Sequence, residues 1–196
     1  MQWNDHSRDV VDGSHAFLGA SKHAWLNYDE EKLKRTYINM KAIEAGTKTH
    51  EFAALCIERG QRLPKTKATL NQYVNDAIGF KMTPELVLYY SDNCFGTTDA
   101  ISFKNNPKKS ENGFNYILRI HDLKTGQTPA SLHQLEIYAA LFFLEYDIKP
   151  EQTEIELRIY QNDDILIGNP TAKDIEPIME KIVRFDKILD KIDAEG

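Results

Sequence analysis

The chain has 196 residues, enough to bury a real core in one domain and too few for two full domains and a linker. Hydrophobic residues make up 41% and charged residues 28%, a globular composition that excludes wholesale disorder. The net charge of −6 argues mildly against a nucleic-acid partner, because phosphate backbones are bound mainly through Lys and Arg. It is not decisive, since bound metal ions can supply positive charge locally.

The sequence shows no pattern typical of a membrane span, a signal peptide or a set of disulfides. No apolar run approaches the ~20 residues that span a bilayer, and residues 1–6 lack the basic and then apolar pattern of a signal peptide. The two cysteines, Cys56 and Cys94, form neither a CxxC pair nor a disulfide framework. We therefore expect a cytoplasmic protein that does not contact a membrane.

The first part of the chain, about residues 14–80, is predicted to be helical. A short helix contains Trp25, and a helical rhythm of charged and apolar residues follows that breaks around Gly46. The remaining helices are ended by glycine or by the change to strand periodicity. The predicted helical stretches after the short helix cover residues 30–54 with the break, 47–58 and 68–80.

From residue 85 the pattern becomes that of strands rich in β-branched and aromatic residues. The predicted strands cover residues 86–90, 94–103, 116–123, 155–161 and 165–167. An amphipathic helix over 131–146 separates the third and fourth strands, and a last helix over 174–192 has Pro177 in its first turn. Three antiparallel strands, a crossover helix and a returning strand predict an α/β fold with a mixed central sheet, about residues 85–167, flanked by helices.

The third predicted strand carries the motif Asp122-Leu123-Lys124. Successive side chains of a strand point to opposite faces, so Asp122 and Lys124 project from the same face. If the strand containing Asp99 lies beside it, two carboxylates for a hard divalent cation stand next to an ammonium. Such a set suits phosphodiester hydrolysis, because the metal lowers the pKa of a water and the lysine orients it. The alternative is an exposed strand ion pair and a turn aspartate.

Four segments resemble the motifs of the PD-(D/E)XK nuclease superfamily in order and approximate spacing. They are Gly46-Thr47-Lys48-Thr49-His50, Gly96-Thr97-Thr98-Asp99, His121-Asp122-Leu123-Lys124-Thr125-Gly126 and Gln134-Leu135-Glu136-Ile137-Tyr138-Ala139. More narrowly, they are similar to the branch with RecB-type nuclease domains, the CRISPR-adaptation exonucleases and the phage recombination exonucleases. The resemblance covers roughly residues 14–161 and implies a single nuclease domain, 1–196, with a restriction-endonuclease-like core.

The resemblance also implies roles for the two strand motifs. Asp99 and Asp122 would bind a catalytic Mg²⁺ or Mn²⁺, and the main-chain carbonyl of Leu123 would add a ligand. Lys124 would position or activate the attacking water.

Two helices would complete the site. His50 would be an additional metal ligand, and Glu51 is the alternative, because relatives often use a glutamate from an equivalent helix. Adjacent helix positions diverge by about 100°, so only one of the two is expected to face the metal, and we favour His50. Gln134 and Tyr138 are one turn apart on one helix face and would hold the DNA backbone or the neighbouring active-site groups.

The chain departs from the family in two ways. Thr98 stands where the family name has a proline, and two cysteines cannot build the four-cysteine iron–sulfur cluster of several RecB-type relatives, so we expect none. The sequence also has no GxxxxGK[ST] loop, so any unwinding must come from a separate helicase.

These features predict a metal-dependent deoxyribonuclease, an exonuclease acting in DNA recombination or processing. The phage branch implies a phage protein in a bacterial host, with an annealing or single-strand-binding protein as partner and with homo-oligomers as in its ring-forming members. The alternatives are a structure-specific endonuclease and a catalytically silent nuclease-fold module that binds DNA or protein.

Overall fold

The computed structural model describes residues 16–195, so residues 14 and 15 of the expected helical part lie outside the described residues. The chain divides into two compact units, residues 1–45 and 46–196, and each is described by itself. The organisation as a single domain stays a prediction. Within residues 16–195, no helix has both the length and the apolar character needed to cross a bilayer.

The described part of the first unit is helical, as predicted. It holds the 3₁₀ helix η1 (Ala20–Asn27) and the beginning of helix α1 (Glu30–Glu58). The carboxylate of Asp29 accepts a hydrogen bond from the N–H of Lys32 at 2.7 Å and so caps the start of α1. The rings of Phe17 and Tyr37 meet edge to face, with centroids 5.2 Å apart.

The predicted break at Gly46 is wrong, because α1 runs without interruption from Glu30 to Glu58. Gly46 is buried, and a Cβ atom added to it would lie 2.9 Å from Oγ1 of Thr125. The glycine therefore permits a close approach of the loop that follows the DxK motif. It does not end the helix, since glycine inside a helix costs only about 1 kcal/mol relative to alanine.

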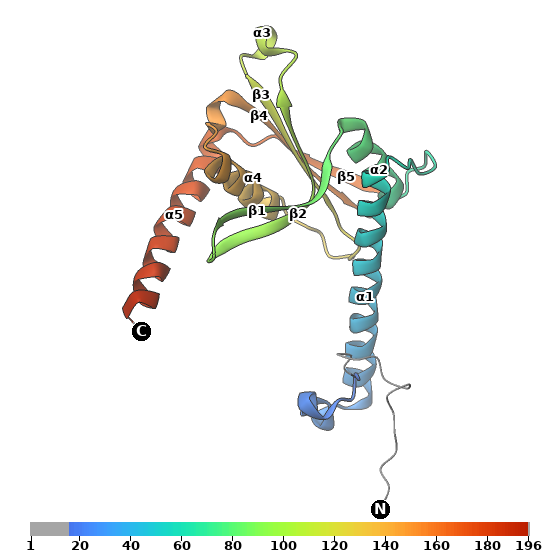
Figure 1. The fold of residues 1–196 in the computed structure, drawn as a ribbon. Helices are drawn as coiled ribbons and strands as arrows, with labels where there is room; N and C mark the ends of the chain where they lie inside the picture. The colour runs from blue at the N-terminus through green and yellow to red at the C-terminus, as the bar shows by residue number, and fades with distance from the viewer. Residues whose placement is uncertain (1–15, 196) are drawn as a thin grey trace, which may run out of the picture. The chain divides into compact units, whose positions relative to one another are not determined.

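The second unit contains the rest of α1 and all the strands (Figure 1). Its further elements are α2 (Thr69–Phe80), β1 (Thr83–Ser91), β2 (Cys94–Asn105), α3 (Lys109–Asn112), β3 (Tyr116–Leu123), α4 (His133–Tyr146), the 3₁₀ helix η2 (Pro150–Gln152), β4 (Thr153–Gln161), β5 (Asp164–Gly168) and α5 (Ala172–Glu195). Apart from the division of α1 at Gly46, the predicted strands and helices are confirmed in type and order, with boundaries that shift by a few residues, and the short helices α3 and η2 were not predicted.

The five strands form one mixed sheet in the order β1-β2-β3-β4-β5. Strands β3 and β4 are parallel, and the other three neighbouring pairs are antiparallel. Helix α4 makes the crossover between the two parallel strands (Figure 1). The prediction of an α/β fold with a mixed sheet flanked by helices is confirmed.

Both faces of the sheet carry an apolar core, which explains why β3 is buried along most of its length. On one face, Leu118 and Ile120 belong to a buried cluster with residues of α4 and with Ile175 of α5. On the other face, Leu123 and Tyr160 belong to a cluster with residues of α1 and α2. The DxK segment at the end of β3 is therefore fixed between two cores.

Helix α5 begins earlier than predicted and places Pro177 in its second turn, so the first-turn prediction is wrong. Asp174 accepts hydrogen bonds from both the N–H and the hydroxyl of Thr171, each at 2.8 Å. The bond from the Thr171 N–H is one half of a capping box, in which an acid three residues later satisfies the N–H before the helix, and it helps to start α5 at Ala172.

Candidate metal centre

The candidate site lies where β2 parts from β3. Ala100 pairs with both Pro84 of β1 and His121 of β3, whereas Thr98 pairs with Leu86 of β1. Asp99 stands between these two positions, at the point where the strands diverge. Side chains at such a divergence can reach both neighbouring strands, so the fold presents the carboxylate of Asp99 to several elements at once.

Two contacts hold the Asp99 carboxylate in the second unit. Its Oδ2 atom accepts a hydrogen bond from the main-chain N–H of Leu123 at 2.7 Å. The same oxygen lies 3.4 Å from Nδ1 of His50 on α1. Asp99 thus links β2 to the end of β3 and to the helix that carries the GxxxH segment.

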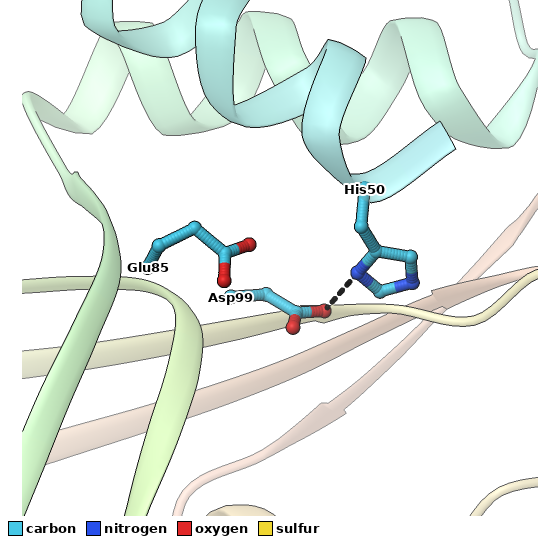
Figure 2. Close-up of side chains that lie close together, drawn as sticks. All are labelled: His50, Glu85 and Asp99. Carbon is cyan, nitrogen blue, oxygen red and sulfur yellow. Dashed lines mark ion pairs between the residues drawn. The ribbon is translucent and has the colours of Figure 1, made fainter. Parts of the chain in front are cut away.

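Glu85 of β1 joins His50 and Asp99, as Figure 2 shows. Each of the three side chains offers one ligand atom, and these atoms all lie within 4.8 Å of one another. Two carboxylate oxygens and one imidazole nitrogen could hold a divalent cation, and the oxygens suit Mg²⁺ or Mn²⁺. The donor set therefore fits the ion expected from the sequence.

Sequence reasoning missed Glu85. It follows Pro84 at the start of β1, where the strand prediction did not reach, and its φ of 50° interrupts regular strand geometry. Because Pro84 pairs with Ala100 and Leu86 with Thr98, Glu85 stands opposite Asp99. The register of the β1–β2 hairpin is the signal that places this residue.

The other predicted residues form a chain of polar contacts beside the three ligands. The ammonium of Lys124 lies 3.1 Å from Oδ1 and 3.0 Å from Oδ2 of Asp122, and it donates a hydrogen bond to Oε1 of Gln134 at 2.9 Å. The amide of Gln134 in turn donates to the hydroxyl of Tyr138 at 3.1 Å. The contact of Asp122 with Lys124 agrees with the prediction that the two side chains share one face of β3.

Asp122 is the most buried carboxylate of the site, with a side chain only 4% exposed. Burial raises its pKa, the charge of Asp99 raises it further, and Lys124 opposes both effects. Burial and the charge of Asp99 likewise raise the pKa of Glu85. These carboxylates repel one another when ionised, so a bound cation would stabilise their charged forms.

The same negative charge acts on His50. Its hydrogen bond with Asp99 raises the pKa of the imidazole, burial opposes the rise, and the charges of Asp99, Asp122 and Glu85 add to it. A metal ion binds the neutral imidazole, so protons and metal compete for this residue.

Two further residues that the sequence analysis considered as ligands, Leu123 and Glu51, are not part of the three-ligand group. The N–H of Leu123 holds Asp99, and its side chain lies in the core of α1 and α2, while the role of its carbonyl as a ligand stays a prediction. Glu51 is not in the three-ligand group but lines a neighbouring hollow of about 460 Å³, together with His50 and Glu85. The geometry favours His50 over Glu51 as the ligand from α1.

Tyr138 is placed by a glycine. A Cβ atom added to Gly96 of β2 would lie 2.8 Å from Cε1 of Tyr138, so the ring packs directly on the strand backbone. This contact fixes the ring on the side of the hairpin that faces α4 and positions its hydroxyl for Gln134.

No protein-family model, curated protein or solved structure matches this chain.

Proposed function

We propose that the chain is a RecB-like member of the PD-(D/E)XK nucleases, with a restriction-endonuclease-like core, that hydrolyses DNA phosphodiester bonds with Mg²⁺ or Mn²⁺. One observation carries the proposal: the ligand group of His50, Glu85 and Asp99 is joined through the N–H of Leu123 to the segment that holds Asp122 and Lys124. Carboxylates that can hold a metal ion, with an ammonium beside them, are groups that can catalyse phosphodiester hydrolysis.

Each side chain has a role in this proposal. Glu85, Asp99 and His50 would hold the divalent ion, with Asp122 as a further ligand beside them, and the ion would stabilise the charge on the phosphate and activate a water. The ammonium of Lys124 donates a hydrogen bond to the attacking water or to the developing negative charge. The bond from water oxygen to phosphorus forms as the bond from phosphorus to the leaving sugar oxygen breaks; the attacking water gives its proton to solvent, and the leaving oxygen takes a proton from solvent.

Gln134 and Tyr138 act through Lys124 in this proposal. The Gln134 carbonyl oxygen accepts a hydrogen bond from the ammonium and the Tyr138 hydroxyl accepts one from the Gln134 amide. They therefore restrict the ammonium to one position, and we regard them as positioning residues. Their removal is expected to lower the rate without abolishing metal binding.

The resemblance to recombination exonucleases favours cleavage from DNA ends over internal cleavage. The two modes are distinguished by whether cleavage requires a free DNA end. An exonuclease shortens end-labelled linear DNA and leaves a covalently closed circle intact, whereas an endonuclease nicks the circle. The test uses linear duplex, linear single-stranded and closed circular DNA, each with Mg²⁺, Mn²⁺ or chelator.

Three proteins make the test specific: the parent, Lys124→Ala, and Lys187→Ala on the exposed part of α5 as a matched lysine control. We expect metal-dependent shortening of linear DNA by the parent and the control and its loss in Lys124→Ala. If folded parent protein cleaves nothing in either metal, the proposal of a nuclease is wrong, and retained DNA binding would then indicate a silent binding module.

A further inference from the structure

The loop that joins α1 to α2 carries a concentration of positive charge that the proposed chemistry does not use (Figure 1). Residues 59–75 are the longest stretch of the sequence without Asp or Glu, and they include Arg59, Arg62, Lys65 and Lys67. These four residues are all exposed and lie within residues 59–68, which we call the basic loop. The loop has a charge of +4 in a chain whose net charge is −6, so it forms a positive surface on an acidic protein.

The fold does not use these charges to form ion pairs. Elsewhere in the chain, basic side chains are neutralised by acids, as in the pairs of Lys34 with Glu30 and of Arg158 with Asp76. Within residues 16–195, by contrast, no carboxylate forms an ion pair with a cation of the basic loop. Like charges repel one another in the free protein, and a bound polyanion would relieve this repulsion.

Two acids border the basic loop, and neither neutralises it. Glu58 is the last residue of α1 and lines the hollow beside His50. The carboxylate of Asp163 accepts hydrogen bonds from the N–H and the hydroxyl of Thr69, at 2.8 and 3.1 Å, and so is engaged at the start of α2. Even when both acids are counted, the region keeps an excess of positive charge.

Neutral amide side chains of α2 hold the basic loop in place. The amide of Asn75 accepts a hydrogen bond from the N–H of Leu63 at 3.0 Å and donates one to its carbonyl oxygen at 2.9 Å. The amide of Asn71 donates to the carbonyl oxygen of Pro64 at 3.0 Å, and the side chain of Leu63 packs on the core between α1 and α2. These contacts fix the main chain and leave the positive charges free, so an anion can bind without first ordering the loop.

The position of the loop indicates how long this anion must be. Arg59 directly follows α1 and comes nine residues after His50, which corresponds to about 14 Å along a helix. A single phosphate cannot reach both residues, whereas stacked nucleotides rise about 3.4 Å each, so about four of them span the distance. Glu51 and Glu58 line the hollow beside the metal centre and repel phosphates. A DNA strand held at that centre therefore needs a positive surface beyond the hollow.

We propose that the basic loop binds the phosphate backbone of DNA, about four nucleotides from the bond cut at the metal centre. The position of the cut rests on the proposed nuclease function. Binding itself needs neither metal nor cleavage and is measured separately.

The experiment measures the affinity of the full chain for a labelled DNA duplex with a single-stranded tail, in chelator and at several salt concentrations. The test variant is Lys65→Gln combined with Lys67→Gln. Each lost phosphate contact lowers the slope of log affinity against log salt by about 0.7 on a single strand and about 0.9 on a duplex. We expect the double variant to bind more weakly at low salt and its slope to be shallower by about 1.4 to 1.8.

Two further double variants show whether the position of the charge matters. Lys65→Arg combined with Lys67→Arg keeps both charges and should keep the slope of the parent. Lys187→Gln combined with Lys191→Gln removes the same charge from the exposed part of α5 and should also leave the slope unchanged. An equal fall in slope for the α5 variant would mean that only the net charge of the protein matters, and the basic loop would then be wrong.

The other outcomes separate this proposal from the nuclease. An unchanged slope in the Lys65→Gln and Lys67→Gln variant, or no binding of DNA by the parent at low salt, overturns the basic loop even if the parent cleaves DNA. Loop-dependent binding without cleavage in Mg²⁺ or Mn²⁺ keeps the basic loop and rejects the nuclease. If polyglutamate of equal charge displaces the labelled DNA as well as unlabelled DNA does, the loop fits an acidic polypeptide and the assignment to DNA is wrong.

Discussion

The main-chain N–H of Leu123 donates a hydrogen bond of 2.7 Å to the carboxylate of Asp99. This bond joins two motifs that are 24 residues apart in the chain, and it does so at the place where β2 leaves β3. If β2 and β3 stayed paired, the N–H of Leu123 would bond to the main chain of β2. Because the two strands separate here, this N–H bonds to the side chain of Asp99 instead. A hydrogen bond to a charged acceptor contributes about 1.5 to 3 kcal/mol, so the site also stabilises the bend in the sheet.

Metal binding should depend on Glu85 and not on Glu51. We expect Mg²⁺ or Mn²⁺ to raise the melting temperature of the parent, and Glu85→Gln to reduce that rise, because one of the three clustered ligands is lost. Without metal, Glu85→Gln should be at least as stable as the parent, since burial and the charge of Asp99 oppose ionisation of Glu85. Thermal unfolding of both proteins with and without metal measures the smaller metal-induced rise and the stability of Glu85→Gln without metal.

Glu51→Gln is the matched control for that measurement. It removes the same charge from the adjacent position of the same helix as His50 and should leave the metal-induced rise unchanged. A rise that disappears in Glu51→Gln and persists in Glu85→Gln would reverse our assignment of the ligands.

The contribution of His50 to stability should fall as the pH rises. Its hydrogen bond with Asp99 raises the pKa of the folded protein's imidazole above the ordinary value of 6.5. The stabilisation is therefore fully present below pH 6.5 and is lost as the pH rises through the raised pKa. The free energy of unfolding of the parent and of His50→Gln, measured in chelator from pH 5.5 upward, should converge at high pH.

A double-mutant cycle identifies the cause of this pH dependence. In an Asp99→Asn background the change His50→Gln should show a much smaller pH dependence, because the charged partner of the imidazole is gone. An unchanged pH dependence would show that another group sets the pKa of His50.

The sequence predicts much of this fold because its periodicity is clear. Buried β3 was predicted with its full span of 116–123, and alternation along it correctly placed Asp122 and Lys124 on one face. Glu85 could not be found in this way, since the hairpin register shifts between Tyr89 and Ser91. Counting back from the turn without that irregularity would place Leu86 opposite Asp99.

Glycine was misread for a related reason. From sequence alone, Gly46 is a helix breaker, and its actual role depends on Thr125, which is distant in the chain and approaches it closely. Local propensity does not contain such a long-range contact. The role of Gly96 also depends on a long-range contact, because the missing side chain lets the ring of Tyr138 pack against the strand.

Gly96→Ala should therefore destabilise the protein and disturb Lys124. The added methyl group would meet the rigid Tyr138 ring at 2.8 Å, and overpacking of this kind costs about 1 to 3 kcal/mol. Displacing the ring also breaks its contact with Gln134 and weakens the positioning of the lysine. Denaturant unfolding measures the first effect, and the rate of DNA cleavage measures the second.

Two comparisons test this steric argument. Gly46→Ala meets only Oγ1 of Thr125, the end of a side chain that can rotate, so it should cost less than Gly96→Ala. Gly96→Ala should also be tolerated when Tyr138 is replaced by alanine. A large loss of stability in that background would mean that the glycine is needed for its backbone conformation and not for the ring.

Glu156 of β4 should make the protein acid-sensitive. Burial alone would raise the pKa of its carboxyl, but Arg119 and Arg158, which each donate a hydrogen bond to its Oε1 at 3.0 Å, overcome this effect, and the pKa falls to about 2. Since its ordinary value is 4.5, the ionised carboxylate contributes stability above pH 4.5 that is lost as the pH falls toward 2, about 3 kcal/mol in all. Glu156→Gln should therefore lower the free energy of unfolding at pH 7, and its difference from the parent should shrink between pH 4.5 and 2. Glu180→Gln, an exposed acid on α5, is the control, and an equal loss in both variants would contradict a specific role for the arginine pair.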